Sequence, residues 1–317
     1  MKKVFVARKL LRSNEKRMSE IWDAKLNFED KVYSQRELIE LSKDCDGILC
    51  SMVDKFDAET INKLSDKVKI ISNIAVGFGN IDIKAAMNKN IIVTNTPDVL
   101  TDATAEIAIL ILLGAARRAT EGRKWVDKKN WTWSADFLMG KQLTDSRLGI
   151  LGMGRIGQAL AERAKSFGMK IHYHNRKKLP PNLEKGAIYH ESLKSLISVS
   201  DFFSINCPTT EETKKIINEE TLSYFLNGAV IINSARGDMI DDEAMINALK
   251  SGKVFALGLD VYNGEPDIHP QYLKLDNVFI LPHLGSATEK TRFAMADLAI
   301  SNIEEYFKTG KCKNTVN

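Results

Sequence analysis

The chain has 317 residues, of which 44% are hydrophobic and 27% charged, and its formal net charge is +4. This composition excludes a disordered or a membrane-spanning class, and the length suggests about two domains at roughly 150 residues each. The positive charge is weak and dispersed, so nothing in it indicates nucleic acid as a partner.

Cysteine usage and the apolar runs indicate a cytoplasmic protein. The four cysteines form no C-x-x-C pair and no zinc-like cluster with histidine, so we expect free thiols and no metal site. The N-terminal run Val4–Ala7 is too short for a signal peptide. The run Ile107–Leu113 ends before membrane-spanning length, so we expect no membrane partner.

Short apolar runs alternate with amphipathic segments through the first hundred residues. The amphipathic segments are centred on Leu38, Ile61 and Ala85. Buried strands are expected at Val4–Ala7, Gly47–Cys50, Lys69–Ser72 and Ile91–Val93. This alternation is the βαβ pattern of a parallel sheet.

A long helix and an irregular stretch follow. An apolar helix is expected from about Ala103 to Ala119, with Thr101 or Asp102 capping its start. The polar, tryptophan-rich stretch Glu121–Gln142 has no clear period, and we interpret it as a loop or an extended arm.

A second alternating series then begins. Helices are expected around Ala159 and Ala244, and a final amphipathic helix from about Ala287 to Phe307. The expected strands are Leu148–Leu151, Lys170–Tyr173, Phe202–Ile205, Val230–Asn233, Ala256–Asp260 and Val278–Leu281. Two series of different character predict an α/β protein with two doubly wound domains and parallel sheets.

A glycine-rich loop joins the first strand of the second series to the next helix. Its sequence is Gly152-Met153-Gly154-Arg155-Ile156-Gly157. Gly152 permits a tight turn, Gly154 lets the backbone approach a pyrophosphate, and Gly157 allows close packing of helix on strand. A chance glycine turn is the alternative, but the position between strand and helix is typical of a dinucleotide-binding loop.

The end of the following strand indicates which dinucleotide binds. An NAD site usually carries an acid about 20 residues after the loop, yet here the turn reads Asn175, Arg176, Lys177 and Lys178. Arg176 can grip a phosphate with two parallel bonds, and Lys177 adds charge. We therefore expect NADP(H) to be preferred, with NAD(H) as the alternative cofactor and a solvated basic loop as the other interpretation.

Three polar residues follow strands of the second series. His283 follows an apolar strand, Arg236 lies in a turn after another, and Glu265 comes just past a third. Open α/β sheets bind ligands at the carboxyl ends of their strands. A carboxylate at Glu265 would orient the His283 ring and favour its protonated form. The alternatives are a structural histidine, a surface arginine and an ordinary turn acid.

The chain resembles the D-isomer-specific 2-hydroxyacid dehydrogenases over essentially its whole length. The matching stretches are Ser72–Asp82, Thr94–Thr101, the glycine loop, Ser234–Gly237, Gly258–Val261, Glu265-Pro266 and Pro282–Ser286. The resemblance implies two Rossmann-like domains with an interdomain cleft. It divides the chain into a discontinuous substrate-binding domain, residues 1–98 plus 287–317, and a dinucleotide-binding domain, residues 99–286.

The resemblance also implies roles for individual residues. Arg236, Glu265 and His283 correspond to the family's catalytic residues. The substrate is expected to contact Met52, Val53, Val76, Gly77, Arg236 and Trp133. The cofactor is expected to contact Thr104, Gly152, Gly154, Arg155, Ile156, Gly157, Asn175, Arg176, Lys177, Cys207, Pro208, Ser234, Asp260 and Ser286.

Within the family the chain is most similar to glyoxylate and hydroxypyruvate reductases. The resemblance implies NADPH-dependent reduction of a small 2-oxo acid to its D-2-hydroxy acid by a homodimer, with the tryptophan-rich arm in the dimer interface. Two alternatives stay open. One is a dehydrogenase for another acid, of D-lactate type or phosphorylated, and the other is a nucleotide-sensing binding protein on the same fold.

Overall fold

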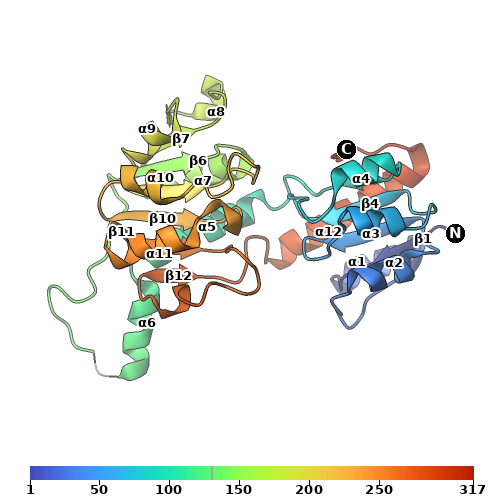
Figure 1. The fold of residues 1–317 in the computed structure, drawn as a ribbon, viewed down its shortest axis with the longest axis horizontal. Helices are drawn as coiled ribbons and strands as arrows, with labels where there is room; N and C mark the ends of the chain where they lie inside the picture. Colours follow the sequence, from blue (N-terminus) through green and yellow to red (C-terminus); the bar gives the residue numbers. More distant parts are fainter. Residues whose placement is uncertain (130) are drawn as a thin grey trace. The chain divides into compact units, whose positions relative to one another are not determined.

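The computed structural model describes residues 1–129 and 131–317 and divides the chain into two compact units. Unit 1 comprises Met1–Leu100 and Ala287–Asn317, and unit 2 comprises Thr101–Ser286. Each unit contains one parallel sheet with helices on both faces (Figure 1). The predicted α/β class with two parallel sheets is therefore confirmed. Among the residues described, no helix combines the length and apolar character that a membrane crossing requires.

The sheet of unit 1 has five strands in the order β2-β1-β3-β4-β5. The strands are β1 (Lys3–Val6), β2 (Asp23–Lys25), β3 (Gly47–Ser51), β4 (Ile70–Ile74) and β5 (Ile92–Thr94). The helices are α1 (Arg12–Ile21), α2 (Gln35–Ser42), α3 (Ala58–Lys63), α4 (Ile83–Asn88) and α12 (Glu289–Thr309). The helices α2, α3 and α4 contain the three predicted amphipathic centres.

Polar caps mark where the helices of unit 1 begin. The side chains of Ser34, Asp57, Asp82 and Thr288 each accept a hydrogen bond from a backbone N–H of the first turn that follows. Such a cap satisfies an amide that would otherwise lack an intrahelical partner. The caps therefore define the residues at which these helices start.

Alternate side chains of the unit 1 strands pack on opposite faces of the sheet. Phe5 and Ile48 lie in the cluster covered by α2, α3 and α4, whereas Val4 and Leu49 lie in the cluster covered by α1 and α12. The hydroxyl of Ser72 in β4 also donates to the carbonyl of Ala299 in α12, at 2.9 Å. The C-terminal helix α12 is therefore part of the hydrophobic core of unit 1.

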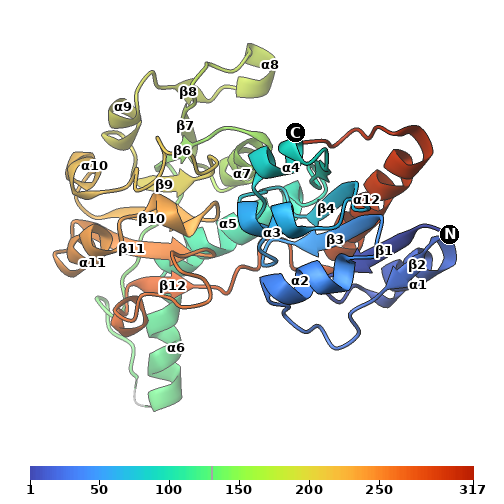
Figure 2. The same cartoon turned by 45° about the vertical axis from the view of Figure 1, so that its right-hand side comes forward.

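The sheet of unit 2 has seven strands in the order β12-β11-β10-β9-β6-β7-β8, which Figure 2 shows in succession. The strands are β6 (Arg147–Leu151), β7 (Lys170–His174), β8 (Ile188–Tyr189), β9 (Phe202–Ile205), β10 (Ala229–Asn233), β11 (Val254–Leu259) and β12 (Val278–Ile280). The helices are α5 (Thr101–Ala116), α6 (Ala119–Lys128), α7 (Arg155–Ser166), α8 (Pro181–Glu184), α9 (Leu193–Ile197), α10 (Glu219–Tyr224) and α11 (Asp242–Lys250).

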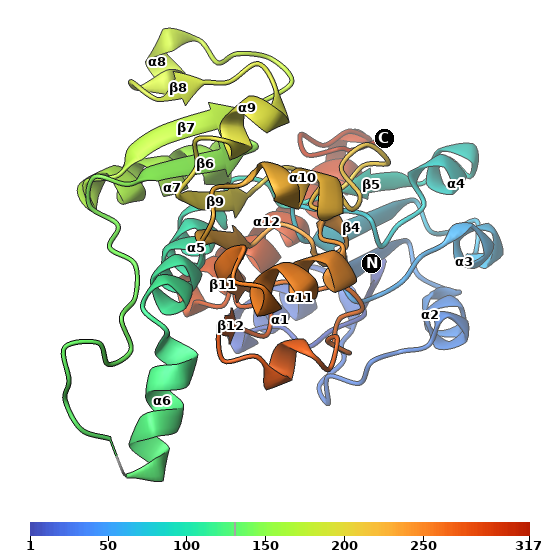
Figure 3. The ribbon, with the colours of Figure 1, turned by 60° about the vertical axis from the view of Figure 1, so that its left-hand side comes forward.

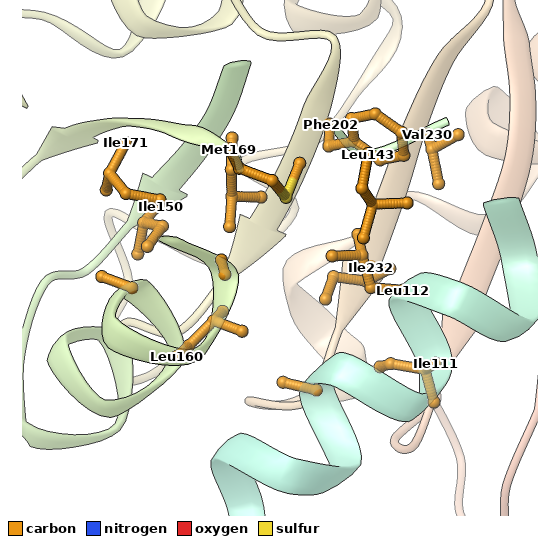
Figure 4. Close-up of a cluster of buried hydrophobic side chains, with 14 of the residues drawn as sticks. Ile111, Leu112, Leu143, Ile150, Leu160, Met169, Ile171, Phe202, Val230 and Ile232 are labelled. Carbon is orange, nitrogen blue, oxygen red and sulfur yellow. The ribbon is translucent and has the colours of Figure 1, made fainter. Parts of the chain in front are cut away.

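Two apolar clusters hold the helices of unit 2 on its sheet. Figure 4 shows one of them, in which Leu112 of α5 lies beside Ile232 of β10 and Leu160 of α7 lies beside Ile150 of β6. The other cluster packs α9, α10 and α11 on the opposite face. A Cβ on Gly258 of β11 would lie 2.6 Å from a backbone oxygen of α5, so this approach requires glycine. Such close packing holds the strand ends in fixed positions, so the loops that follow the strands start from a rigid base.

The arm differs from the sequence-based expectation. Its first part is the helix α6, which extends beyond the β12 edge of the sheet (Figure 3). Arg118, at φ 55°, separates α6 from the apolar helix α5. No side chain caps the start of α6 and none of its residues is buried, so the usual start signal and core-facing face are both missing. Residue 130, inside the expected arm, lies outside the described residues. The short edge strands β2 and β8 were not expected either.

Candidate active site

Three candidate catalytic side chains of unit 2 follow neighbouring strands. Arg236 comes after β10, Glu265 after β11 and His283 after β12, and these strands pair in parallel in that order. Because parallel strands end at the same edge of a sheet, the three turns meet there. The sequence-based placement of all three residues at strand ends is confirmed.

A hydrogen bond joins the histidine to the glutamate. His283 Nδ1 lies 2.7 Å from Glu265 Oε2, and Glu265 Oε1 accepts from the backbone N–H of Tyr262 at 3.0 Å. Burial raises the pKa of Glu265, but the hydrogen bond and charge of His283 outweigh it and leave that pKa below its usual value. An ionised carboxylate can only accept, so Nδ1 carries the proton. The ring nitrogen Nε2 stays available for other chemistry.

Asp260 fixes the loop that carries the histidine. His283 has a left-handed backbone conformation, φ 56°, and its N–H donates to the carbonyl of Asp260 at 2.9 Å. The Asp260 carboxylate accepts from the N–H groups of Leu284 at 2.6 Å and Gly285 at 2.8 Å. Burial raises its pKa, although these backbone bonds and His283 oppose the shift. Thr104 of α5 donates to the Gly285 carbonyl at 3.0 Å and holds the loop from its other side.

The arginine turn is equally constrained. The side chain of Asn233 accepts from the N–H of Ala235 at 2.9 Å and donates to the carbonyl of Arg236 at 2.7 Å. A Cβ on Gly237 would lie 1.9 Å from the backbone of Tyr262, so the turn packs directly on the segment that leads to Glu265. Burial lowers the pKa of Arg236, and the nearby carboxylates of Glu265 and Asp238 oppose this shift. The cation therefore lies half-buried beside an acid.

The glycine loop has the geometry of a dinucleotide cradle. Gly152 has φ +95°, and a Cβ there would lie 2.5 Å from the N of Cys207. A Cβ on Gly157 would lie 2.4 Å from the carbonyl oxygen of Gly152. A Cβ on Gly154 would meet nothing within 4 Å, and no side chain caps α7 there. The loop therefore leaves open the space that a pyrophosphate needs at the positive end of a helix.

The loop also lies at the switch point of the sheet. The strand β6 pairs with β7 on one side and with β9 on the other, so the chain leaves β6 in one direction and later returns to its opposite edge. Dinucleotides bind at this point in doubly wound sheets. Cys207 and Pro208 follow β9 at this point, and Ser234 follows β10. The hydroxyl of Ser234 is buried and has no hydrogen-bond partner among the described residues.

The basic turn after β7 contacts the glycine loop through its first residue. The side-chain oxygen of Asn175 accepts from the N–H of Met153 at 2.7 Å. Arg176 and Lys177 are both exposed, and no acid stands in the turn. The turn is therefore held against the loop while its cations stay accessible to an anion.

The other candidate substrate residues lie elsewhere. Met52 and Val53 follow β3 of unit 1, and Val76 and Gly77 follow β4, its neighbour in the sheet. Trp133 lies in the arm of unit 2 with 81% of its surface exposed. Among the residues described, the structure does not bring Trp133 to the histidine–glutamate pair.

Sequence reasoning missed the contacts that support these loops. It expected Asp260 at the cofactor and not at the histidine loop, and it gave no role to Asn73 or Asn80. The contacts of Asp260 with Leu284 and of Asn80 with Ser51 join positions more than 20 residues apart, whereas Asn73 binds Gly77 four residues away. Their only signal in the sequence was a polar residue within or just after an apolar strand. Such a residue must find a partner when buried, but the sequence does not say which one.

Comparison with known proteins agrees with this geometry. The family model "D-isomer specific 2-hydroxyacid dehydrogenase, NAD binding domain" matches residues 109–285. A glycerate dehydrogenase of Hyphomicrobium methylovorum is 40% identical over 309 residues, covering 96% of each chain. A glyoxylate reductase of Thermococcus litoralis is 39% identical over 320 residues, covering 99% of this chain and 96% of its own.

A solved structure extends the likeness to three dimensions. The NADPH-dependent glyoxylate/hydroxypyruvate reductase of Sinorhizobium meliloti, in complex with NADP and malonate, matches with a TM-score of 0.88 and 31% identity. The match covers 99% of this chain and 96% of that one. The chain therefore belongs to the NAD(P)-dependent D-isomer-specific 2-hydroxyacid dehydrogenases, in the glyoxylate/hydroxypyruvate reductase branch.

Proposed function

We propose that this enzyme reduces glyoxylate to glycolate and hydroxypyruvate to D-glycerate, with NADPH as the preferred cofactor. The observation that carries the proposal is the hydrogen-bonded pair of His283 and Glu265 beside the half-buried cation of Arg236. The names of the relatives support the substrate class. We further propose that the enzyme is a homodimer in the cytoplasm. The exposed apolar side chains of the arm, among them Trp131 and Trp133, support the dimer.

The domain roles follow from the positions of the sites. Residues 99–286 would bind the dinucleotide, because the glycine loop and the basic turn lie there. Residues 1–98 and 287–317 would bind the substrate, with the N–H groups of Val76 and Gly77 directed to its carboxylate. When bound, the nicotinamide supplies the hydride that reduces the 2-oxo carbon.

Arg236 would hold and polarise the substrate. A guanidinium can donate two parallel bonds, one to the carboxylate and one to the 2-oxo oxygen. Negative charge grows on that oxygen during reduction, so the contact strengthens in the transition state. The nearby Glu265 opposes the effect of burial on the arginine and helps keep it charged.

His283 would supply the proton. Its Nδ1 is bound to Glu265, so Nε2 can hold a proton at the 2-oxo oxygen and release it there as the hydroxyl forms. The carboxylate stabilises the imidazolium before transfer and keeps the ring in one orientation. The histidine loop contributes precision, because Asp260 fixes the backbone on both sides of the ring.

The proposed role of Arg236 in holding the substrate is tested by Arg236→Lys. Lysine keeps the charge but loses the planar fork, so we expect kcat to fall by about 10²-fold or more while KM for glyoxylate rises. NADPH affinity, measured by fluorescence titration, should stay within twofold. Near-normal kcat/KM on every 2-oxo acid tested would remove Arg236 from the proposed role.

The proton donor is tested by Glu265→Gln. Loss of the carboxylate removes the charged acceptor that holds the His283 ring in one orientation, so kcat/KM for glyoxylate should fall by roughly 10²-fold while NADPH affinity stays within twofold. A matched control is Glu243→Gln, since Glu243 lies 3.2 Å from His269 in another carboxylate–histidine pair of unit 2. A kcat/KM that is unchanged in Glu265→Gln, or lowered equally in the control, contradicts the assignment.

The cofactor preference is tested by Arg176→Ala. Each charge-assisted bond to a phosphate contributes roughly 1.5–3 kcal/mol, so NADPH should bind at least about tenfold more weakly while NADH binding is little changed. The control is Arg123→Ala, which removes an exposed arginine from α6. Equal weakening of NADPH and NADH would show that Arg176 does not read the 2′-phosphate.

A further inference from the structure

Two loops of unit 1 carry the residues that the proposed function assigns to the substrate. The first loop, Ser51–Asp54, follows β3, and the second loop, Ala75–Asn80, follows β4. Strand pairing ends at Ser51 and Ile74, so the sheet itself does not hold the loops to each other. Backbone pairing resumes beyond the loops, at the bridge between Phe56 and Ile81, where the N–H of Phe56 donates to the carbonyl of Asn80 at 2.7 Å. Between the strand ends and this bridge, side chains join the two loops.

Asn80 ties the second loop to the first. Its side-chain Nδ2 donates to the carbonyl of Ser51 at 3.0 Å and to the carbonyl of Asp54 at 2.9 Å. These two carbonyls flank the Met52-Val53 pair. An amide nitrogen carries two hydrogens, so both donors of Asn80 are used in this contact.

Asn73 completes an amide pair with Asn80. Its Nδ2 donates to the side-chain oxygen of Asn80 at 3.1 Å and to the carbonyl of Gly77 at 3.0 Å. The thiol of Cys50 contacts its oxygen at 3.6 Å, and Asn73 itself is fully buried. Asn80 is half-buried. A polar pair whose donors are satisfied and whose inner member is fully buried is rigid, because any movement leaves a buried group unpaired.

The same region orients the peptide groups beside Val76. The side chain of Asn95 donates to the carbonyl of Val76 at 2.8 Å, and the N–H of Thr96 donates to the carbonyl of Ala75 at 2.9 Å. A peptide group is planar, with its C=O and N–H directed oppositely. These bonds therefore fix the direction of the N–H of Gly77 and of Val76. Within the described residues, neither of these N–H groups has an acceptor of its own.

We propose that Asn73, Asn80 and Asn95 are positioning residues for substrate recognition. Asn95 orients the N–H of Gly77 for a carboxylate by holding the Val76 carbonyl, and Asn73 holds the carbonyl of Gly77. Asn80, which Asn73 holds in turn, locks the loop containing Met52 and Val53 against this segment. The proposal rests on the proposed function, which assigns these N–H groups to the substrate. Preorganised donors lose little conformational freedom on binding, so these three asparagines would determine the affinity for the 2-oxo acid.

The test compares Asn80→Ala and Asn95→Ala with a matched control. Asn27 is buried in the same unit, and its Nδ2 also donates to two carbonyls, those of Ala7 and Lys31, both at 2.8 Å. Asn27→Ala thus removes a comparable amide bridge elsewhere. The measurements are Tm, steady-state kcat and KM for glyoxylate, the inhibition constant of oxamate, and the dissociation constant of NADPH.

We expect KM and the oxamate inhibition constant to rise together by about 10-fold to 100-fold in Asn80→Ala and Asn95→Ala. NADPH affinity should stay within twofold, because the glycine loop and the basic turn belong to the other unit. Asn27→Ala should lower Tm similarly and leave KM within twofold. In the double variant Asn73→Ala/Asn80→Ala, KM should rise no more than in the worse single variant, because the pair acts as one bridge.

Three results would overturn the proposal. One is KM within twofold of wild type in both single variants. Another is an equal rise of KM in Asn27→Ala, which would indicate only a general loss of stability. If Asn80→Ala does not fold, the half-buried Asn95→Ala alone decides. Wild-type protein that reduces no 2-oxo acid would instead overturn the proposed function, and this inference with it.

Discussion

Parallel pairing is the constraint on which both units depend. Parallel strands bring all their carboxyl ends to one edge, so residues from distant parts of the chain can meet there. Arg236, Glu265 and His283 each follow a different strand of the unit 2 sheet. The same pairing leaves irregular backbone at the edge, where sheet hydrogen bonds have ended. Side chains must satisfy this backbone. Asp260 and Asn233 do so in unit 2, and Asp54, Asn73 and Asn80 do so in unit 1.

The two kinds of support suit different electrostatic tasks. Asp260 is a buried acid that accepts two backbone N–H groups, and it fixes the histidine loop in a left-handed conformation. Together with Glu265, which binds Nδ1 of the ring, it holds His283 in one arrangement. Around Val76 and Gly77 the neutral side chains of Asn95 and Asn73 donate to the carbonyls of these two residues and leave their N–H groups to an anion. An acid placed there would repel the proposed substrate carboxylate.

Much of this arrangement could be predicted from the sequence. The apolar runs located the longer strands, and the loop from Gly152 to Gly157 was recognisable because tight turns and close packing demand glycine at fixed intervals. The positions of Arg236, Glu265 and His283 followed from the strands before them. The helix α6 was missed because it has no side-chain cap at its start and buries none of its residues. The contacts of Asn73 and Asn80 were missed because the hydrogen-bond partners of a side-chain amide depend on the tertiary structure. The role of Trp133, exposed on the arm, stays a prediction.

We propose that this chain reduces small 2-oxo acids to D-2-hydroxy acids at the Arg236–Glu265–His283 cluster. To test this, the purified enzyme is incubated with hydroxypyruvate and NADPH, NADPH oxidation is followed, and the glycerate is resolved by chiral chromatography. We expect oxidation coupled one-to-one to D-glycerate, and loss of turnover by roughly two to four orders of magnitude in His283→Ala while NADPH still binds. L-glycerate as the product, or no oxidation with hydroxypyruvate or glyoxylate under conditions where NADPH binds, would contradict it.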